Sequence, residues 1–103
     1  MTDSSPSDAA PIRQTVLYSG RVQGVGFRAT VARTAQRFPV LGYVQNLPDG
    51  RVRLVAEGEP DELDLFLGSV SATMNSYIAA QNRTETLATG EFERFFIKRI
   101  GLA

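Results

Sequence analysis

A glycine-rich segment after a strand-like pattern constrains the fold of this chain more than any other feature. Three glycines fall within seven positions of Gly20-Arg-Val-Gln-Gly-Val-Gly-Phe27. Glycine weakens the interior of both strands and helices, so this segment is predicted to be a tight turn. Residues 12–19, just before it, are rich in β-branched and aromatic side chains and predict a strand. The chain is therefore expected to end its first strand in a specialised turn.

A helix is predicted directly after this turn, from about Gly26 to Arg37. Pro39 ends it, because proline lacks the amide hydrogen that a helix needs. Apolar side chains recur there at helical spacing and form one stripe, made of Phe27, Val31, Ala35 and Phe38. The glycine turn is thereby placed at the N-terminal end of a helix.

The remaining patterns predict four more strands and a second helix. Proline and two acidic residues near its first turn mark the start of that helix. The predicted elements are a strand at Leu41–Leu47, a hairpin turn at Pro48–Gly50, a strand at Arg51–Glu57, a helix opening at Gly58–Pro60 with a buried stripe of Leu63, Phe66, Leu67 and Val70, a strand within Tyr77–Thr86, a loop at Leu87–Gly90 and a closing strand at Phe92–Ile100.

This order, β-α-β-β-α-β with a short extra strand, matches an α+β sandwich of the ferredoxin-like type. We expect an antiparallel sheet with two helices on one face. The length of 103 residues suits one domain, which we place at residues 12–103. Residues 1–11 are rich in Ser, Asp, Ala and Pro and lack apolar periodicity, so we expect a disordered tail there.

The composition removes whole classes of chemistry. The chain has no cysteine, which excludes disulfides, thiolate metal sites and cysteine nucleophiles, and no histidine, the usual proton shuttle near neutral pH. Ten arginines and one lysine balance eleven acids, whereas nucleic-acid binders usually carry a basic excess. We therefore expect no nucleic-acid partner. Arginine presents a planar fork of donors that suits phosphate and carboxylate groups.

The sequence contains no pattern typical of a membrane or secreted protein. No apolar run approaches the roughly 20 residues that a membrane helix needs. The first residues lack the basic head and apolar stretch of a secretory signal. We therefore expect a cytoplasmic protein with no membrane partner.

The glycine turn is a candidate anion site. Successive backbone N–H groups in such a turn can converge on an anion, and a helix N-terminus adds further unpaired N–H groups. Arg28, in the first turn of the predicted helix, is placed to hold a phosphate with two hydrogen bonds. The alternative is that the glycines serve only the sharp turn and that Arg28 is a solvated surface residue. A Walker loop is excluded, because no Gly-Lys-Ser/Thr follows, and the chain is too short for a dinucleotide-binding fold.

Asn46 is a second candidate, near the end of a predicted strand and just before a turn. Its amide both donates and accepts, so it can hold a water and a substrate oxygen at once. The alternative is a turn-entry residue that bonds its own backbone, and the pattern by itself favours that interpretation. Asp49-Gly50, just after it, is interpreted as the turn alone.

Together these segments resemble the acylphosphatase family. The turn reads G-R-V-Q-G-V-G-F-R, the signature of that family. The family pattern G-[aromatic]-V-x-N-x-x-D-G-x-V appears at residues 42–52, and its closing F-x-I-x-R appears at residues 95–99. The three patterns occur in the right order, and the resemblance spans roughly Val16 to Arg99.

The resemblance implies a ferredoxin-like fold and hydrolysis of acyl phosphates to a carboxylate and inorganic phosphate, without metal or cofactor. The family's catalytic arginine corresponds to Arg28 and its water-placing asparagine to Asn46. The phosphate cradle corresponds to the backbone of Gln23, Gly24, Val25, Gly26 and Phe27, together with Arg28. The expected partner is a small acyl phosphate, and we expect a monomer.

Three other functions remain open at this point. The same fold could bind phosphate without catalysis. An acylphosphatase-like domain could serve carbamoyl-phosphate chemistry inside a larger enzyme, although this chain is expected to hold no further domain. An RNA-binding module of this fold needs stacking aromatics on its central strands, for which the sequence offers only Tyr18 and Tyr43.

Overall fold

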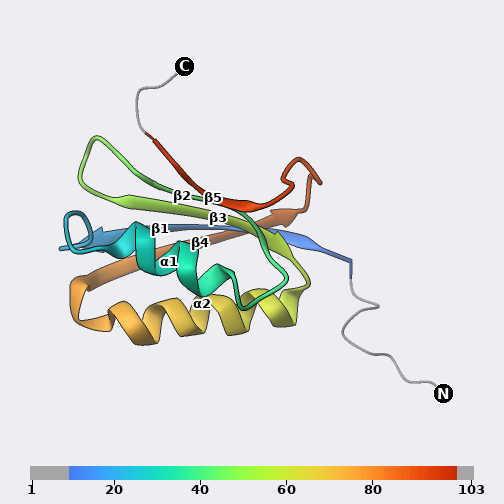
Figure 1. Cartoon of the computed structure of the whole chain (residues 1–103), viewed down its shortest axis with the longest axis horizontal. Helices are drawn as coiled ribbons and strands as arrows, with labels where there is room; N and C mark the ends of the chain where they lie inside the picture. Colours follow the sequence, from blue (N-terminus) through green and yellow to red (C-terminus); the bar gives the residue numbers. More distant parts are fainter. Residues whose placement is uncertain (1–9, 100–103) are drawn as a thin grey trace.

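The computed structural model describes residues 10–99, which form a five-stranded sheet and two α-helices (Figure 1). The expected tail at residues 1–9 and the chain end at residues 100–103 lie outside this described part. The elements in chain order are β1 (Ile12–Gly20), α1 (Phe27–Ala35), β2 (Leu41–Asn46), β3 (Val52–Gly58), α2 (Pro60–Met74), the short 3-10 helix η2 (Asn75–Tyr77), β4 (Ile78–Leu87) and β5 (Phe95–Lys98). Within residues 10–99, no helix is both long enough and apolar enough to span a bilayer.

The sheet has the strand order β4-β1-β3-β2-β5. The first four strands pair antiparallel, with two helices on one face, and the predicted ferredoxin-like α+β fold is confirmed. The fifth strand differs, because β5 pairs with β2 in parallel and makes the sheet mixed. The chain leaves β4 at one edge and enters β5 at the opposite edge, so it crosses the sheet before pairing.

Both helices pack against the same face of the sheet and enclose the core (Figure 1). Alternate residues of the strands point into it, which is the period that a half-buried strand needs. Both predicted helical stripes are confirmed, since only Phe38 remains partly exposed. The core comprises Val16, Tyr18, Val22, Phe27, Val31, Ala35, Val40, Val44, Val52, Leu54, Ala56, Leu63, Phe66, Leu67, Val70, Met74 and Phe95.

Several predicted boundaries differ from the structure by one residue, as at Leu47 and Leu87, and two differ by more. The helix α1 ends at Ala35 rather than Arg37, because the following N–H groups bond carbonyls three residues back and tighten the chain. The closing strand begins at Phe95 rather than Phe92. Phe92 lies in the preceding connection, where its ring packs at 5.9 Å from the ring of Tyr43. The predicted end of that strand, at residue 100, lies outside the described residues.

The connection between β4 and β5 is fastened to the sheet face opposite the helices. Glu57 of β3 is 5% exposed and accepts hydrogen bonds from the backbone N–H groups of Thr89 (2.9 Å) and Gly90 (3.0 Å). Arg13 of β1 donates to the same carboxylate at 2.7 Å. This anchor lies directly upstream of β5 and therefore helps to set where that strand enters the sheet.

Candidate active site

The loop between β1 and α1 turns its apolar side chains inward and its glycines outward. Val22 is fully buried and Val25 packs against the core, which fastens the loop. Gly24 and Gly26 are exposed, and each has φ of +79°, in the left-handed region that side chains disfavour. A Cβ at either glycine would contact nothing within 4 Å, so glycine is required here for backbone conformation and not for space.

The helix α1 starts directly from this loop and presents its N-terminus to the same side. Gly26 is the N-cap residue, no side chain of the described residues caps the helix, and no acidic residue lies in the first turn. The first amide hydrogens of a helix have no partner within the helix, and they carry partial positive charge. The end of α1 is therefore suited to a negatively charged group.

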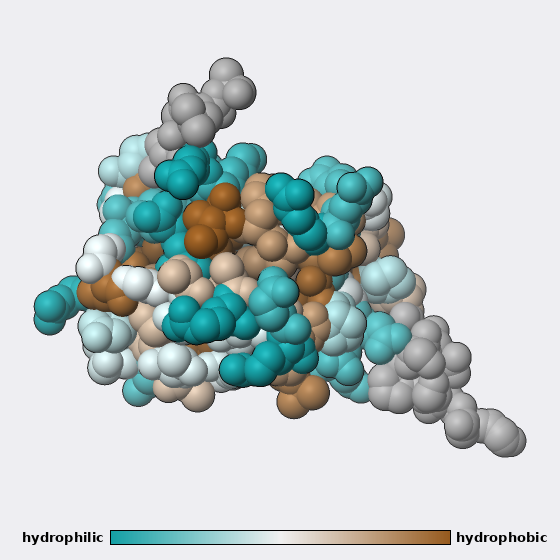
Figure 2. Space-filling model, viewed as in Figure 1, coloured by the Kyte–Doolittle hydropathy of each residue, from teal (hydrophilic) through white to brown (hydrophobic). Residues whose placement is uncertain are grey.

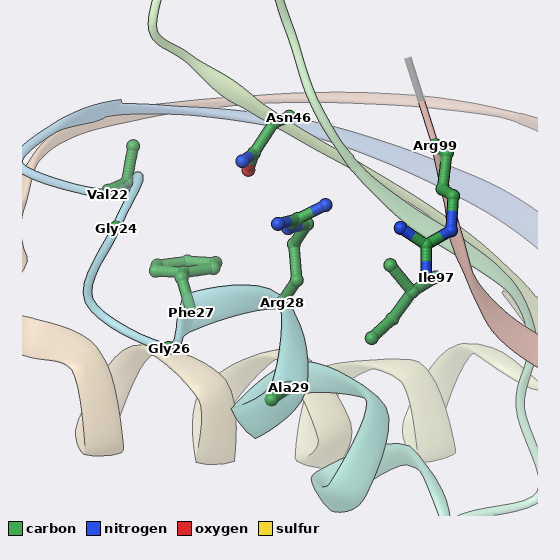
Figure 3. Close-up of a pocket in the computed structure, with 9 residues that line it drawn as sticks. All are labelled: Val22, Gly24, Gly26, Phe27, Arg28, Ala29, Asn46, Ile97 and Arg99. Atoms are coloured by element: carbon green, nitrogen blue, oxygen red, sulfur yellow. The ribbon is translucent and has the colours of Figure 1, made fainter. Parts of the chain in front are cut away.

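Arg28 is half-buried in the first turn of α1. Its guanidinium points away from the helix and toward the end of β2 (Figure 3). Among residues 10–99 it has no side-chain hydrogen bond and no ion pair. A half-buried guanidinium without an acidic partner leaves its fork of donors available to an incoming anion.

Asn46 is the last residue of β2, and it lies on the same side of the strand as buried Val44. The strand continues beyond the core at this point, so the amide projects toward Arg28 instead of into packed side chains (Figure 3). Its Oδ1 atom is buried and has no hydrogen-bond partner among the described residues. Buried acceptors are rarely left unpaired, so this atom indicates a place for a bound donor.

Gln23 links the glycine loop to the turn between β2 and β3. Its side-chain amide donates to the carbonyl of Leu47 at 2.8 Å and to that of Arg51 at 2.9 Å. These two hydrogen bonds tie the loop to the residues that immediately follow Asn46. The sequence predicted only a backbone role for Gln23, and it gave no sign of this side-chain link.

One pocket of about 280 Å³ brings these groups together (Figure 3). Gln23 and Val25 of the predicted cradle do not line it. Ile97 and Arg99, from β5 and the residue just beyond it, do line it and were missed from the sequence. The signal that could have found them is the alternation of the closing strand, in which every second residue shares a face. The lining residues are Val22, Gly24, Gly26, Phe27, Arg28, Ala29, Asn46, Ile97 and Arg99.

Among residues 10–99, the pocket lining contains two arginines and no acidic residue. The nearby turn after β2 carries Asp49, which accepts hydrogen bonds from the backbone and the guanidinium of Arg51 at 3.0 and 2.9 Å. These bonds lower the pKa of Asp49 and match its predicted role in the turn. Among residues 10–99, no three acidic side chains gather where they could hold a metal ion.

The sequence model of the acylphosphatase family matches residues 14–97, which is most of the chain. The chain belongs to the acylphosphatase family. An acylphosphatase of Methylococcus capsulatus is 42% identical over 88 residues, covering 84% of this chain and 96% of that protein. The expected family and the expected enzyme class, a hydrolase of acyl phosphates, are therefore confirmed.

Solved structures agree with this membership of the acylphosphatase family. The crystal structure of acylphosphatase from Bacillus subtilis has a TM-score of 0.76 at 32% identity, covering 84% of this chain and 98% of that one. The crystal structure of T. kodakarensis HypF has a TM-score of 0.75 at 28% identity, covering 85% of this chain but only 12% of that one. The fold thus occurs both as nearly a whole chain and as a small part of a larger one.

Proposed function

We propose that this acylphosphatase uses Arg28 and the glycine loop to hold the phosphoryl group, and Asn46 to place the attacking water. One observation carries the proposal. The buried Oδ1 of Asn46 and the guanidinium of Arg28, neither of which has a partner among residues 10–99, project into one pocket from opposite sides (Figure 3). One side chain offers an acceptor for a water, and the other offers charge and paired donors for a phosphate.

Phosphoryl binding follows from the loop and the helix end. The backbone N–H groups around Gly24 and Gly26 and the N-terminus of α1 supply donors that need no side chain. Arg28 adds a two-pronged, charge-assisted contact. Phosphoryl transfer depends mainly on such positioning and on electrostatic stabilisation of the charged oxygens, so these groups serve the transition state.

The attacking water is held by the amide of Asn46. Oδ1 accepts a hydrogen bond from the water, and the NH₂ group is free to donate to a phosphoryl oxygen. The water oxygen bonds to phosphorus while the bond from phosphorus to the acyl oxygen breaks. The carboxylate leaves with the bonding electrons, and the water proton passes to the phosphoryl group, since the chain has no histidine and none of the described lining residues is acidic.

The test is hydrolysis of benzoyl phosphate by the purified chain with EDTA present, compared with Arg28→Gln. We expect fast turnover that falls at least about 100-fold in the variant. Arg33→Gln is the matched control, because Arg33 lies exposed in the last turn of the same helix. Absence of turnover by folded wild-type protein would overturn the proposal and favour a phosphate-binding module.

The remaining expectations form the rest of this proposal: a cytoplasmic monomer that acts on a small molecule and binds no nucleic acid. The groups that the proposed mechanism needs all come from one chain, so the mechanism requires no second subunit. Against an RNA-binding module, Tyr18 is fully buried in the core and cannot stack on a base. The ring of Tyr43 already packs against Phe92 and Phe96 and lies under Lys98.

A further inference from the structure

The parallel pairing of β5 with β2 carries a row of side chains from the core into the pocket. Gly42 pairs with Phe95 and Val44 with Ile97, and paired residues of neighbouring strands point to the same face. The last pair is Gln45 with Lys98, and Arg99 follows directly after it. Phe95 is buried in the core, Ile97 is 40% exposed, and Arg99 is exposed at the pocket.

Arg99 therefore brings a second guanidinium to a pocket whose lining, within the described part of the chain, has no acidic residue. It points back from β5 toward Arg28, with Ile97 below it (Figure 3). Arg99 has no side-chain hydrogen bond or ion pair within residues 10–99. In the region of β5, the surface shows a hydrophobic patch with hydrophilic groups beside it (Figure 2).

The two arginines occupy different parts of the pocket, with Arg28 at its centre and Arg99 at one side (Figure 3). Arg28 stands between the glycine loop on one side and the pair Ile97 and Arg99 on the other (Figure 3). A phosphoryl group held by the loop and Arg28 leaves the opposite wall for the rest of the substrate. That wall offers one apolar side chain and one cation.

We propose that Ile97 and Arg99 form the acyl end of the site, where Arg99 pairs with a second anionic group on the acyl portion. This inference rests on the proposed function. Ile97 contacts the carbon skeleton of the acyl group, and the guanidinium of Arg99 makes a charge-assisted contact with a carboxylate beyond it. The preferred substrates are acyl phosphates whose acyl group carries a negative charge of its own.

The test compares two substrates that differ by one carboxylate, benzoyl phosphate and 4-carboxybenzoyl phosphate. We expect Arg99→Gln to lower kcat/KM for the carboxylated substrate about fivefold, the effect of an exposed ion pair, and to leave benzoyl phosphate within about twofold. Lys98→Gln is the matched control. It removes the same charge one residue earlier, where the side chain faces the other side of the sheet and lies over Tyr43.

The alternative position for Arg99 is on the phosphoryl group itself. In that case Arg99→Gln would reduce kcat/KM for both substrates equally and would weaken inhibition by inorganic phosphate. That result overturns the inference. A variant whose kcat/KM is unchanged for both substrates overturns it as well. Wild-type turnover of benzoyl phosphate separates the two claims, because its absence would overturn the proposed function first.

Discussion

At the residue scale, the proposed mechanism divides the chemistry between the charge of Arg28 and the oriented amide of Asn46. Neither side chain has a hydrogen-bonding partner for its functional atoms among the described residues. A buried acceptor without a partner costs on the order of 1–3 kcal/mol. The position of Asn46 therefore favours binding of a ligand at some expense of stability.

Replacing Asn46 by alanine separates its effect on catalysis from its effect on stability. We expect kcat to fall about 100-fold to 1,000-fold, because the water loses its oriented acceptor, while inhibition by inorganic phosphate changes little. The free energy of unfolding in urea should not decrease, because the variant removes an unpaired buried acceptor. Asn82→Ala, at an exposed position of β4, is the control. A normal kcat in Asn46→Ala would contradict the water-placing role.

At the element scale, the glycine loop is held from several directions. Val22 and Val25 fasten it to the core, and Gln23 ties it to the turn after β2. The exposed glycines adopt the left-handed conformation that aims their backbone at the pocket. The loop that we propose to bind the phosphoryl group is thus held in place, and its shape depends on backbone dihedral angles and not on contacts of the glycines.

Two glycine substitutions test this dependence. Gly26→Ala should destabilise the protein by about 1–2 kcal/mol, because alanine disfavours φ of +79° although the space is open. Gly68→Ala is the matched comparison, inside α2 and equally uncrowded, and should stabilise by about 0.5–1 kcal/mol. Urea unfolding measures the stability of each variant, and benzoyl phosphate assays measure its activity. Equal effects of the two substitutions would show that the loop conformation is not constrained.

At the scale of the whole molecule, Glu57 couples β1, β3 and the connection that leads to β5. Burial by itself would raise the pKa of Glu57, but hydrogen bonds from Thr89, Gly90 and Arg13 lower it to about 2. The carboxylate therefore stabilises the fold while it is charged. Because the connection precedes β5, the same contacts support the strand that carries Ile97 and reaches Arg99.

The free energy of unfolding should decrease in acid, because the carboxylate of Glu57 becomes protonated. The folded pKa lies below the ordinary value of 4.5, so the contribution is complete above pH 4.5 and is lost as the pH falls toward 2. It amounts to about 3 kcal/mol. The free energy of unfolding in urea should be higher for wild type than for Glu57→Gln at pH 7, and this difference should narrow between pH 4.5 and 2.

The control for this pH dependence is Glu93→Gln. Glu93 lies exposed in the same connection and makes no side-chain hydrogen bond within residues 10–99. The free energy of unfolding of Glu93→Gln should stay close to that of wild type at every pH. A difference for Glu57→Gln that stays the same size at pH 7 and pH 2.5 would contradict the charge-based role of Glu57.

Local patterns in the sequence determined most of the fold and the centre of the candidate site. The two helical stripes, the hairpin turn and the order of elements along the chain follow from spacings within a few residues, and the glycines at 24 and 26 follow from φ values that only glycine adopts readily. The motifs also indicated Arg28 and Asn46, which the structure brings to one pocket, while their catalytic roles stay predictions.

Only the tertiary structure decided which distant segments meet. The strand β5 pairs in parallel with β2, and the connection before it is held by Glu57, more than 30 residues away along the chain. The hydrogen bonds of Gln23 to Leu47 and Arg51 likewise join residues 24 and 28 positions apart. A residue's own spacing pattern specifies its local conformation and its face, but contacts across the sheet arise only when all the strands have packed.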